Sequence, residues 1–557
     1  MRLTGAEIII KLLERQGIST IAGIPGGANL PLYDALAESP IRHVLTRHEQ
    51  GAGFIAQGMA RVSGKPAVFF ATSGPGATNT LTAIADAKLD SIPVICITGQ
   101  VPLSMIGTDA FQEVDTYGLS VPITKHNYLV RSAESLLTII PEAFRVAASG
   151  RPGPVVVDVP KDVQTAVVEF DEWPEPGVPE AGPEIIEAEM RHAASMINAA
   201  ERPILYLGGG VVQSGASAEA REMAEKASIP CAVTLMGLGV LPTDHPLYLG
   251  MLGMHAARYT NLILEECDLL VAVGVRFDDR ATGKVAEFCP RAKIIHVDID
   301  PSELDKIKTA TASITGDVRD SLAALLPMVE RSGRNEWMAR VGALKAAHPM
   351  IVPEPDSAVS AYGVILKAAE LAGEDAIVCT DVGQHQMRTA QVYPFRHPRQ
   401  WLTSGGLGTM GFGMPAAIGA ALAAPERTVI CFSGDGSIMM NIQDLATAVE
   451  NNVRIKVILT NNNALGLVRQ QQDLFYGKRY FASDYSYAVD FIKIAEGFGM
   501  KAHDLGACAD PAAALAAALA EDGPSLIHVP LSPDDPVYPM VPPGAANSHM
   551  IGGERHV

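Results

Sequence analysis

Short runs of apolar, mostly β-branched residues alternate with longer helical patterns along the whole chain. The runs are apolar on both faces, as strands buried within a parallel sheet must be. Small turn residues follow most of them, which is typical of successive strand–helix units with helices on both faces of a sheet. The clearest runs are Ala67–Ala71, Val94–Thr98, Val155–Val159, Ile204–Leu207, Leu269–Val273, Ile294–Val297, Ile377–Thr380, Val429–Phe432, Ile455–Leu459 and Leu526–Val529. The pattern predicts an α/β protein made of doubly wound parallel sheets.

Two stretches interrupt this alternation and indicate linkers. Glu169–Glu184 reads EFDEWPEPGVPEAGPE, and Pro349–Ser357 reads PMIVPEPDS; both are rich in proline and acidic residues. A chain of 557 residues suggests three or four domains at roughly 150 residues each. We therefore predict three α/β domains in series and a proline-rich tail, at residues 1–168, 185–345, 358–530 and 531–557.

Composition and charge narrow the class of protein. The net charge is −19, from 43 basic and 62 acidic residues, so we expect neither nucleic acid nor an anionic membrane as a partner. No stretch approaches the ~20 apolar residues that span a bilayer. The N-terminal apolar run, Ile8–Ile10, is too short for a signal-peptide core and instead predicts an amphipathic helix. Seven dispersed cysteines without a CxxC pair indicate reduced, buried thiols, so we expect a cytoplasmic protein.

A pair of polar motifs follows two predicted strands of the third domain. Gly434-Asp435-Gly436-Ser437 comes after VICFS, and the Asn461-Asn462-Asn463-Ala464 segment comes after IKVILT, one strand–helix unit later. A diphosphate is bound through a hard cation such as Mg²⁺, which prefers oxygen ligands. Asp435 offers a carboxylate, Asn462 an amide oxygen and the next turn a backbone carbonyl, while the glycines and a helix N-terminus suit phosphates. GDGS alone could be a plain turn, but the combination predicts a diphosphate and metal site.

The first domain carries a glutamate between a strand-like segment and a glycine-rich helix start, in His48-Glu49-Gln50-Gly51-Ala52. An isolated HEQG would be interpreted as a helix cap. Here, however, GIPGG (Gly23–Gly27) lies upstream and TSGPG (Thr72–Gly76) downstream, and such loops after strands are typical of cofactor contacts.

The GDG motif (Gly434–Gly436), the following asparagines and Glu49 together resemble the motifs of thiamine-diphosphate enzymes. Further blocks, which extend over nearly the whole chain, narrow the resemblance to the catalytic large subunit of acetohydroxyacid synthase, also called acetolactate synthase. These blocks are ITGQVP (Ile97–Pro102), IGTDAFQEVD (Ile106–Asp115), SGRPGPVVVDVPKDVQ (Ser149–Gln164), GMLGMH (Gly250–His255), GVRFDD (Gly274–Asp279), DVGQHQM (Asp381–Met387), GLGTMGFGMPAAIGA (Gly406–Ala420) and VYPMVPPGAANS (Val537–Ser548).

The resemblance implies a function and a role for each domain. The first domain would bind the thiamine pyrimidine ring, the central domain FAD, and the third domain the diphosphate and Mg²⁺. The family's reaction removes carbon dioxide from pyruvate and joins the remaining unit to a second 2-keto acid. It gives 2-acetolactate, or 2-aceto-2-hydroxybutyrate when 2-ketobutyrate is the acceptor, for branched-chain amino acid biosynthesis. The cofactor carries the chemistry, and the protein orients it.

Specific residues follow from the same resemblance. Glu49 would hydrogen-bond the aminopyrimidine ring and promote loss of the C2 proton, and Asp435, Asn462 and the carbonyl of Ala464 would be the Mg²⁺ ligands. Glyoxylate carboligase, a similar enzyme, carries valine at the glutamate position, so Glu49 argues against that activity. The other implied thiamine-diphosphate contacts are Pro25, Gly26, Ser73, Asn79, Gly383, Gln384, His385, Gly408, Met410, Gly434, Gly436, Ser437, Gly466 and Leu467.

The second substrate is an anion, and Arg276 in GVRFDD could hold its carboxylate bidentately. The alternative is an ion pair of Arg276 with Asp278 or Asp279 on the same loop.

The resemblance also implies that other side chains shape the site. Phe111 and Gln112 would line it, Met251 would touch the acceptor's side chain, and Met410 would support the bent cofactor from beneath. The alternative for both methionines is an ordinary core position.

In the central domain GVRFDD (Gly274–Asp279) with HVDIDP (His296–Pro301) resembles the flavin-binding members more than the catabolic acetolactate synthases, which lack flavin. A glycine triplet alone is weak evidence for a nucleotide, and the sequence offers no redox partner, so we expect FAD in a structural role. The implied FAD contacts are Arg151, Gly208, Gly209, Gly210, Gly253, His255, Gly274, Arg276, Asp298, Asp317 and Val318.

One position departs from the family pattern. After the asparagines the family usually reads LGMVRQWQ, whereas this chain has Gln471 where tryptophan is expected. That tryptophan shapes the acceptor pocket, to which Val468 would also belong, and forms part of the herbicide site. Losing its apolar contact with one methylene is worth about 1–3 kcal/mol. We therefore predict a weaker preference for 2-ketobutyrate and resistance to sulfonylurea-type inhibitors.

Two alternatives to acetolactate formation stay open. The chain could be a related thiamine-diphosphate carboligase or decarboxylase with another acceptor, which Gln471 keeps in view. It could also be a catalytically silent regulatory or scaffold subunit, which the intact Glu49, Asp435 and Asn462 argue against. The resemblance further implies a homodimer with the cofactor between two chains, a possible tetramer, and a possible separate small regulatory subunit.

Overall fold

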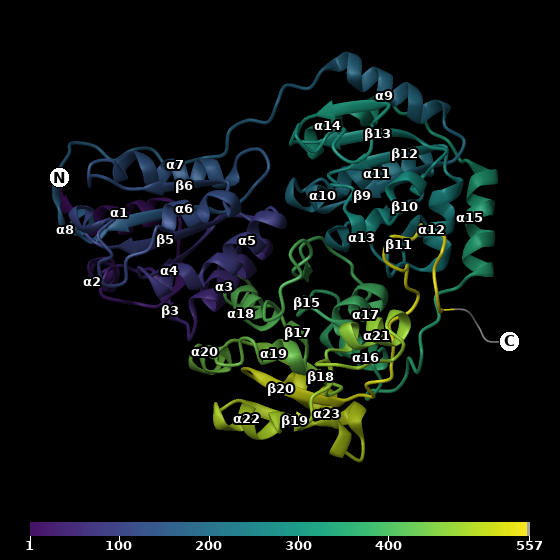
Figure 1. Ribbon diagram of the computed structural model, residues 1–557. Coiled ribbons are helices and arrows are strands. Elements are labelled where there is room, and N and C mark those ends of the chain that lie inside the picture. The colour runs from purple at the N-terminus through teal and green to yellow at the C-terminus, as the bar shows by residue number, and fades with distance from the viewer. Residues whose placement is uncertain (554–557) are drawn as a thin grey trace.

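The computed structural model describes residues 1–553, which form three α/β domains in series, each on a six-stranded parallel sheet (Figure 1). All ten strands predicted from apolar runs are present, and several extend by one or two residues: β17 ends at Gly434 and β18 at Asn461. The predicted fold class is confirmed.

The first domain has the strand order β3-β2-β4-β5-β7-β6. Its strands are β2 (Thr20–Gly23), β3 (Arg42–Leu45), β4 (Ala67–Ala71), β5 (Val94–Gln100), β6 (His126–Leu129) and β7 (Val155–Pro160). Its helices are α1 (Gly5–Arg15), α2 (Leu30–Ala37), α3 (Glu49–Ser63), α4 (Pro75–Asn79), α5 (Leu81–Leu89), α6 (Thr116–Ser120), α7 (Leu136–Ala148) and α8 (Lys161–Thr165). The expected N-terminal helix is α1, which a capping box of Thr4 and Glu7 starts.

The third domain repeats this strand order as β16-β15-β17-β18-β20-β19. Its strands are β15 (Ile377–Thr380), β16 (Trp401–Leu402), β17 (Val429–Gly434), β18 (Ile455–Asn461), β19 (Lys501–Asp504) and β20 (Ser525–Pro530). Its helices are α16 (Gly363–Ala372), α17 (Gln384–Val392), α18 (Gly413–Ala423), α19 (Asp435–Ile438), α20 (Asp444–Glu450), α21 (Gly466–Phe475), α22 (Phe491–Gly497) and α23 (Pro511–Ala520). The strand order reverses between β15 and β17, and open α/β sheets bind ligands at such a switch point.

The middle domain has a different order, β11-β10-β9-β12-β13-β14. Its strands are β9 (Pro203–Leu207), β10 (Cys231–Val233), β11 (Tyr248–Met251), β12 (Leu269–Val273), β13 (Lys293–Asp298) and β14 (Ala312–Thr315). Its helices are α9 (Glu187–Ala199), α10 (Gly209–Gln213), α11 (Ser217–Ala227), α12 (Arg258–Glu266), α13 (Asp279–Thr282), α14 (Val318–Leu325) and α15 (Asn335–Ala347). Its switch point lies between β9 and β12.

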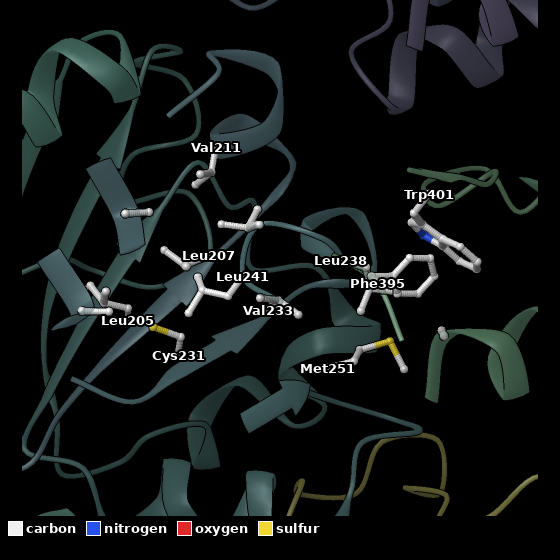
Figure 2. Close-up of a cluster of buried hydrophobic side chains, with 14 of the residues drawn as sticks. Leu205, Leu207, Val211, Cys231, Val233, Leu238, Leu241, Met251, Phe395 and Trp401 are labelled. Carbon is white, nitrogen blue, oxygen red and sulfur yellow. The ribbon is translucent and has the colours of Figure 1, made fainter. Parts of the chain in front are cut away.

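Shared hydrophobic cores join the three sheets, because alternate residues of the third sheet face different neighbours. Cys379 and Cys431 lie in a cluster with Phe69 and Cys96 of the first sheet. Val378, Ile430 and Phe432 lie in a cluster with Leu205 and Val271 of the middle sheet. Figure 2 shows Phe395 and Trp401 of the third domain beside Leu238 and Met251 of the middle domain.

The first and third domains meet where α3 packs along α18 (Figure 1). Glycines make this close approach possible. A Cβ on Gly58 would clash with the carbonyl oxygen of Ala416, and a Cβ on Gly419 would clash with the carbonyl oxygen of Ile55. The backbones of the two helices are therefore in direct contact.

Some features differ from the sequence predictions or were not foreseen. A two-stranded antiparallel ribbon, β1 (Arg2–Thr4) with β8 (Val167–Glu169), closes the first domain. Cys508 is partly exposed, which corrects the expectation that all cysteines are buried; the other six are buried, and all seven are free. The described part of the tail packs on the middle domain, where Val541 N–H donates to the Met254 carbonyl at 2.8 Å. The last four residues of the predicted tail, 554–557, lie outside the described residues.

Candidate active site

The two polar motifs of the third domain meet at the carboxyl ends of the neighbouring strands β17 and β18. The Ala464 N–H lies 3.2 Å from Asp435 Oδ2 and 3.1 Å from Asn462 Oδ1, so one backbone amide joins both side chains. Asp435 is 5% exposed, and burial raises the pKa of its carboxyl to about 6. The three predicted metal ligands are thus brought together, and a cation beside them would favour the ionised form of Asp435.

Three glycines near this cluster pack closely against neighbouring side chains. A Cβ on Gly434 would lie 3.0 Å from the His385 ring, and one on Gly466 would clash with Gln384 Oε1. A Cβ on Gly436 would come within 2.6 Å of the Tyr485 hydroxyl and 3.5 Å of Met410 Cε. These positions admit backbone but no side chain.

The remaining predicted diphosphate contacts lie on the same edge of the sheet. Gln384 and His385 open α17, and Gly383 precedes them. His385 is buried with no partner for Nε2, and burial lowers its pKa to about 3. Ser437 Oγ donates to the Val382 carbonyl at 2.9 Å, and Leu467 lies in the first turn of α21, half-buried.

In the first domain Glu49 is the first residue of α3 and is half-buried, with His48 as the cap. The Asn79 side-chain amide donates to Glu49 Oε2 at 2.9 Å. A Cβ on Gly76 would lie 3.5 Å from Glu49 Oε1, which puts the TSGPG loop against the carboxylate. Helix capping, the alternative for this segment, is done by His48, so Glu49 remains available.

The other first-domain residues predicted to contact the cofactor surround this glutamate. A Cβ on Gly26 would contact Thr72, so the GIPGG loop packs directly on the TSGPG loop. Ser73 is 1% exposed, whereas Pro25 is exposed. The structure therefore brings Gly26, Asn79 and Glu49 together.

The loop with Phe111 and Gln112 lies beside this cluster but does not enclose it. A Cβ on Gly74 would come within 2.9 Å of Gln112 Cα, while the Phe111 side chain is 87% exposed. Within one chain Phe111 therefore lines no site.

In the middle domain the glycine triplet faces the switch point. The Gly210 N–H donates to the Gly274 carbonyl at 3.1 Å, and Cβ atoms on Gly208 or Gly210 would clash with Gly274. Close packing of the loops after β9 and β12 therefore explains two of the three glycines without a nucleotide. The third, Gly209, has only Met236 nearby.

Arg276 does not form the ion pair considered as its alternative role. Asp278 caps α13, and Asp279 lies 3.8 Å from the guanidinium of Arg280. The Arg276 guanidinium instead lies 3.3 Å from the position of a Cβ on Gly406, a residue of the third domain. It shows no ion pair within residues 1–553 and remains free to bind an anion.

Several predicted FAD contacts have other partners in this chain. Arg151 pairs with Glu303 at 2.7 Å and Asp300 at 3.2 Å. Asp317 caps α14, and Val318 lies in the hydrophobic core.

Three further predicted FAD positions lie close to the switch point or the tail. Asp298 is 8% exposed, and burial raises its pKa to about 6. His255 is buried with Nδ1 3.1 Å from the Pro539 carbonyl, and burial lowers its pKa to about 4. Gly253 packs against the Arg280 carbonyl, where a Cβ would clash.

The predicted acceptor-pocket residues do not form one pocket within this chain. Gln471 and Val468 are exposed on α21, whereas Met251 is 8% exposed in the core between the middle and third domains. Met251 thus occupies the core position considered as its alternative. A cavity of ≈ 500 Å³ lies beside it, lined by Tyr248, His255, Lys345 and Tyr393 among others, away from Asp435 and Glu49.

Sequence reasoning missed a buried charged cluster that is bonded to the loop carrying Gly408 and Met410. Arg61, Asp86 and Asp90 lie on α3 and at the end of α5, and their partners lie in the loop that carries Gly408 and Met410. These residues belong to no motif, since their partners are far away in the sequence.

Comparisons with known proteins agree with this geometry. Family models of thiamine pyrophosphate enzymes match in chain order: the N-terminal TPP binding domain at residues 3–119, the central domain at 190–325 and the C-terminal TPP binding domain at 381–529. The fold and these matches define the class as a thiamine pyrophosphate enzyme.

Full-length relatives narrow the class. The chain is 61% identical over 552 residues to the acetolactate synthase isozyme 1 large subunit of Escherichia coli strain K12, covering 99% of this chain and 98% of that protein. It is 46% identical to the isozyme 2 large subunit of the same organism, covering 99% of each chain. It is 45% identical to the acetolactate synthase large subunit of Corynebacterium glutamicum, covering 99% and 90%. The chain belongs to the family of acetolactate synthase large subunits.

Two negative findings concern the described residues. Among them, no helix has the length and apolar character required to cross a bilayer. Residues 1–553 also contain no cluster of three or more His, Cys, Asp or Glu side chains that could hold a metal ion. A site with one carboxylate, one amide and one backbone carbonyl would not be such a cluster.

Proposed function

We propose that the protein is an acetolactate synthase. It decarboxylates pyruvate and joins the remaining two-carbon unit to a second 2-keto acid, giving 2-acetolactate for branched-chain amino acid biosynthesis. The observation that carries the proposal is that Asp435 and Asn462 both contact the backbone amide of Ala464, with Gly434, Gly436 and Gly466 close by.

This chain fits Mg²⁺ and the diphosphate of thiamine diphosphate. Asp435, Asn462 and the Ala464 carbonyl would hold the metal ion, and Gly434, Gly436 and Gly466 would admit the phosphates. The buried, unpartnered Nε2 of His385 is a polar atom that a phosphate oxygen could satisfy. When bound, the cofactor supplies a nucleophilic carbon and an electron sink for decarboxylation.

Glu49 has the role of a proton-handling acid in the first domain. The Asn79 amide holds one carboxylate oxygen at 2.9 Å, which fixes the orientation of the side chain and leaves the other oxygen for a ligand nitrogen. A carboxylate so oriented stabilises the protonated ring nitrogen of an aminopyrimidine.

Arg276 would bind the carboxylate of the acceptor keto acid, because its guanidinium has no ion-pair partner among the described residues and faces the third-domain loop. The switch point between β9 and β12 suits a dinucleotide such as FAD. Gly209, Gly274 and Asp298 would lie against it, whereas Arg151, Asp317 and Val318 would contribute mainly to the protein's own packing.

The assembly is proposed to be at least a homodimer with the active site between two chains. Large apolar side chains are exposed in segments that flank the site, including Phe111 at 87%, Phe481 at 84% and Met440 at 53%. Exposed apolar surface of this kind indicates an interface. A separate small regulatory subunit is a further proposed partner, because the relatives are named large subunits, and the location is proposed to be cytoplasmic.

The test is product formation from pyruvate alone, with thiamine diphosphate, Mg²⁺ and FAD. Wild-type protein should form acetolactate, and Glu49→Gln should reduce the rate by about 10²–10⁴-fold. The matched control is Glu7→Gln, at another helix start of the same domain, which should leave the rate unchanged. Acetaldehyde, or no product, from the wild type would refute the proposal.

A further inference from the structure

A buried charged cluster lies on the face of the first domain that meets the third. Arg61 of α3 is 5% exposed, Asp86 of α5 is 0% and Asp90 is 8%. The Arg61 guanidinium lies 2.7 Å from Asp90 and 3.7 Å from Asp86, so that one cation serves two carboxylates. Burying three charges is costly unless the surrounding groups satisfy them.

Apart from Arg61, the groups that donate hydrogen bonds to the two carboxylates belong to the third domain. Asp90 accepts hydrogen bonds from the N–H groups of Gly405, at 3.0 Å, and Gly406, at 2.7 Å. Asp86 Oδ1 accepts from the hydroxyls of Ser404 and, at 2.9 Å, of Thr409. Both carboxylates are therefore bonded to the single loop between β16 and α18, defined here as residues 404–411.

Without these bonds the loop would be held to the rest of residues 1–553 by hydrogen bonds only at its two ends, Ser404 and Gly411. It contains four glycines, of which Gly408 and Gly411 have positive φ angles of 71° and 90°. Its other anchors lie at its two ends: the Gln386 amide donates to the Ser404 carbonyl at 3.2 Å, Gly411 N–H donates to Asp381 at 2.7 Å, and the Asn441 amide donates to the Gly411 carbonyl at 2.7 Å. A glycine-rich segment has high conformational freedom when unrestrained, so two buried carboxylates restrict it strongly.

The loop carries residues that face the candidate site. Met410 reaches Gly436, and the Arg276 guanidinium lies against Gly406. The position of the loop therefore determines how close Met410 lies to the diphosphate motif. It also determines what Arg276, the proposed acceptor-binding residue, packs against.

We propose that Asp86 and Asp90 are positioning residues that hold loop 404–411 in the conformation that receives thiamine diphosphate, an inference that rests on the proposed function. Both act through the loop, to which their carboxylate oxygens are bonded. Arg61 keeps the two carboxylates together, and its guanidinium carbon lies 5.0 Å from the ring centre of Phe412, the residue next to the loop.

The test compares Asp90→Asn with a matched control, Asp268→Asn. Asp268 also accepts from two consecutive backbone amides, Glu201 N–H at 2.8 Å and Arg202 N–H at 2.9 Å, but within the middle domain. Calorimetric titration with thiamine diphosphate and Mg²⁺ should show about a tenfold loss of affinity in Asp90→Asn. Asp268→Asn should bind with the wild-type affinity. Equal affinities of the two variants would overturn the proposal.

A second readout needs no cofactor, and therefore separates this proposal from the proposed function. Amide hydrogen exchange of the ligand-free protein should be faster at residues 404–411 in Asp90→Asn and in Thr409→Val, and unchanged in Asp268→Asn. Unchanged exchange in the loop would refute the positioning role even if the enzyme is active. If the wild type bound no thiamine diphosphate while the loop responded, the proposed function would fail and the anchoring of the loop would stand.

Discussion

At the scale of single residues, the candidate site depends on two groups of polar side chains, one at strand ends and one on a helix. Asp435 and Asn462 stand directly after apolar strands, so their spacing alone placed them at one sheet edge, where the Ala464 amide joins them. Asp86 and Asp90 stand in and just after an ordinary helix. Their role depends on a loop more than 300 residues later in the chain, because Ser404 donates a hydrogen bond to Asp86. No local sequence pattern predicts such a contact.

Gln471 carries a prediction at this scale. It is exposed on α21, where a large ring could be added without disturbing the core. Gln471→Trp should increase the specificity for 2-ketobutyrate over pyruvate by about tenfold, because an aromatic face would contact the extra methylene. The measurement is product ratio in a competition between the two keto acids. Gln471→Ala, which adds no apolar surface, serves as control; a strong wild-type preference for 2-ketobutyrate would contradict the account.

At the scale of elements, long apolar strands were predicted well and short or half-polar ones were missed. All ten predicted runs are strands, as expected for strands that are buried on both faces of a parallel sheet. β16 has two residues and β10 three, too few for a pattern. The helical pattern expected after GDGS is two short helices, α19 and α20, rather than one.

The contact of α3 with α18 yields a second prediction. Gly58→Ala places a Cβ against the Ala416 carbonyl, and relieving that clash requires backbone movement at about 1–3 kcal/mol. The apparent unfolding temperature in calorimetry should fall by several degrees. Gly342→Ala in α15 has nothing within 4 Å of its new Cβ and should raise the temperature slightly, because alanine favours helix. Equal effects of the two substitutions would mean that the helices do not approach as described.

At the scale of the whole molecule, the third domain packs against both other domains. One face of its sheet shares a core with the first domain and the other with the middle domain. The first and third domains also have the same strand order. No sequence repeat reveals this, because the same topology can form from different residues when the pattern of buried positions is similar. The alternation of strands and helices was enough to predict the order of the domains and their fold class. It did not predict how the domains pack against one another.

The proposed dimer places Glu49 of one chain opposite the Asp435 cluster of another. Within one chain no hydrogen bond or ion pair joins Glu49 to that cluster in residues 1–553, and Phe111 beside Glu49 is 87% exposed. Both observations are expected if a second chain completes the site.

Subunit complementation tests this claim, together with the proposed reaction, most directly. Glu49→Gln and Asp435→Asn chains, each inactive alone, are produced together with different affinity tags, and the mixed dimer is isolated through both tags. Each mixed dimer then has one intact site and one doubly altered site, so acetolactate formation from pyruvate should return to about half the wild-type rate per dimer. A mixed dimer as inactive as its parents would contradict an active site shared between chains.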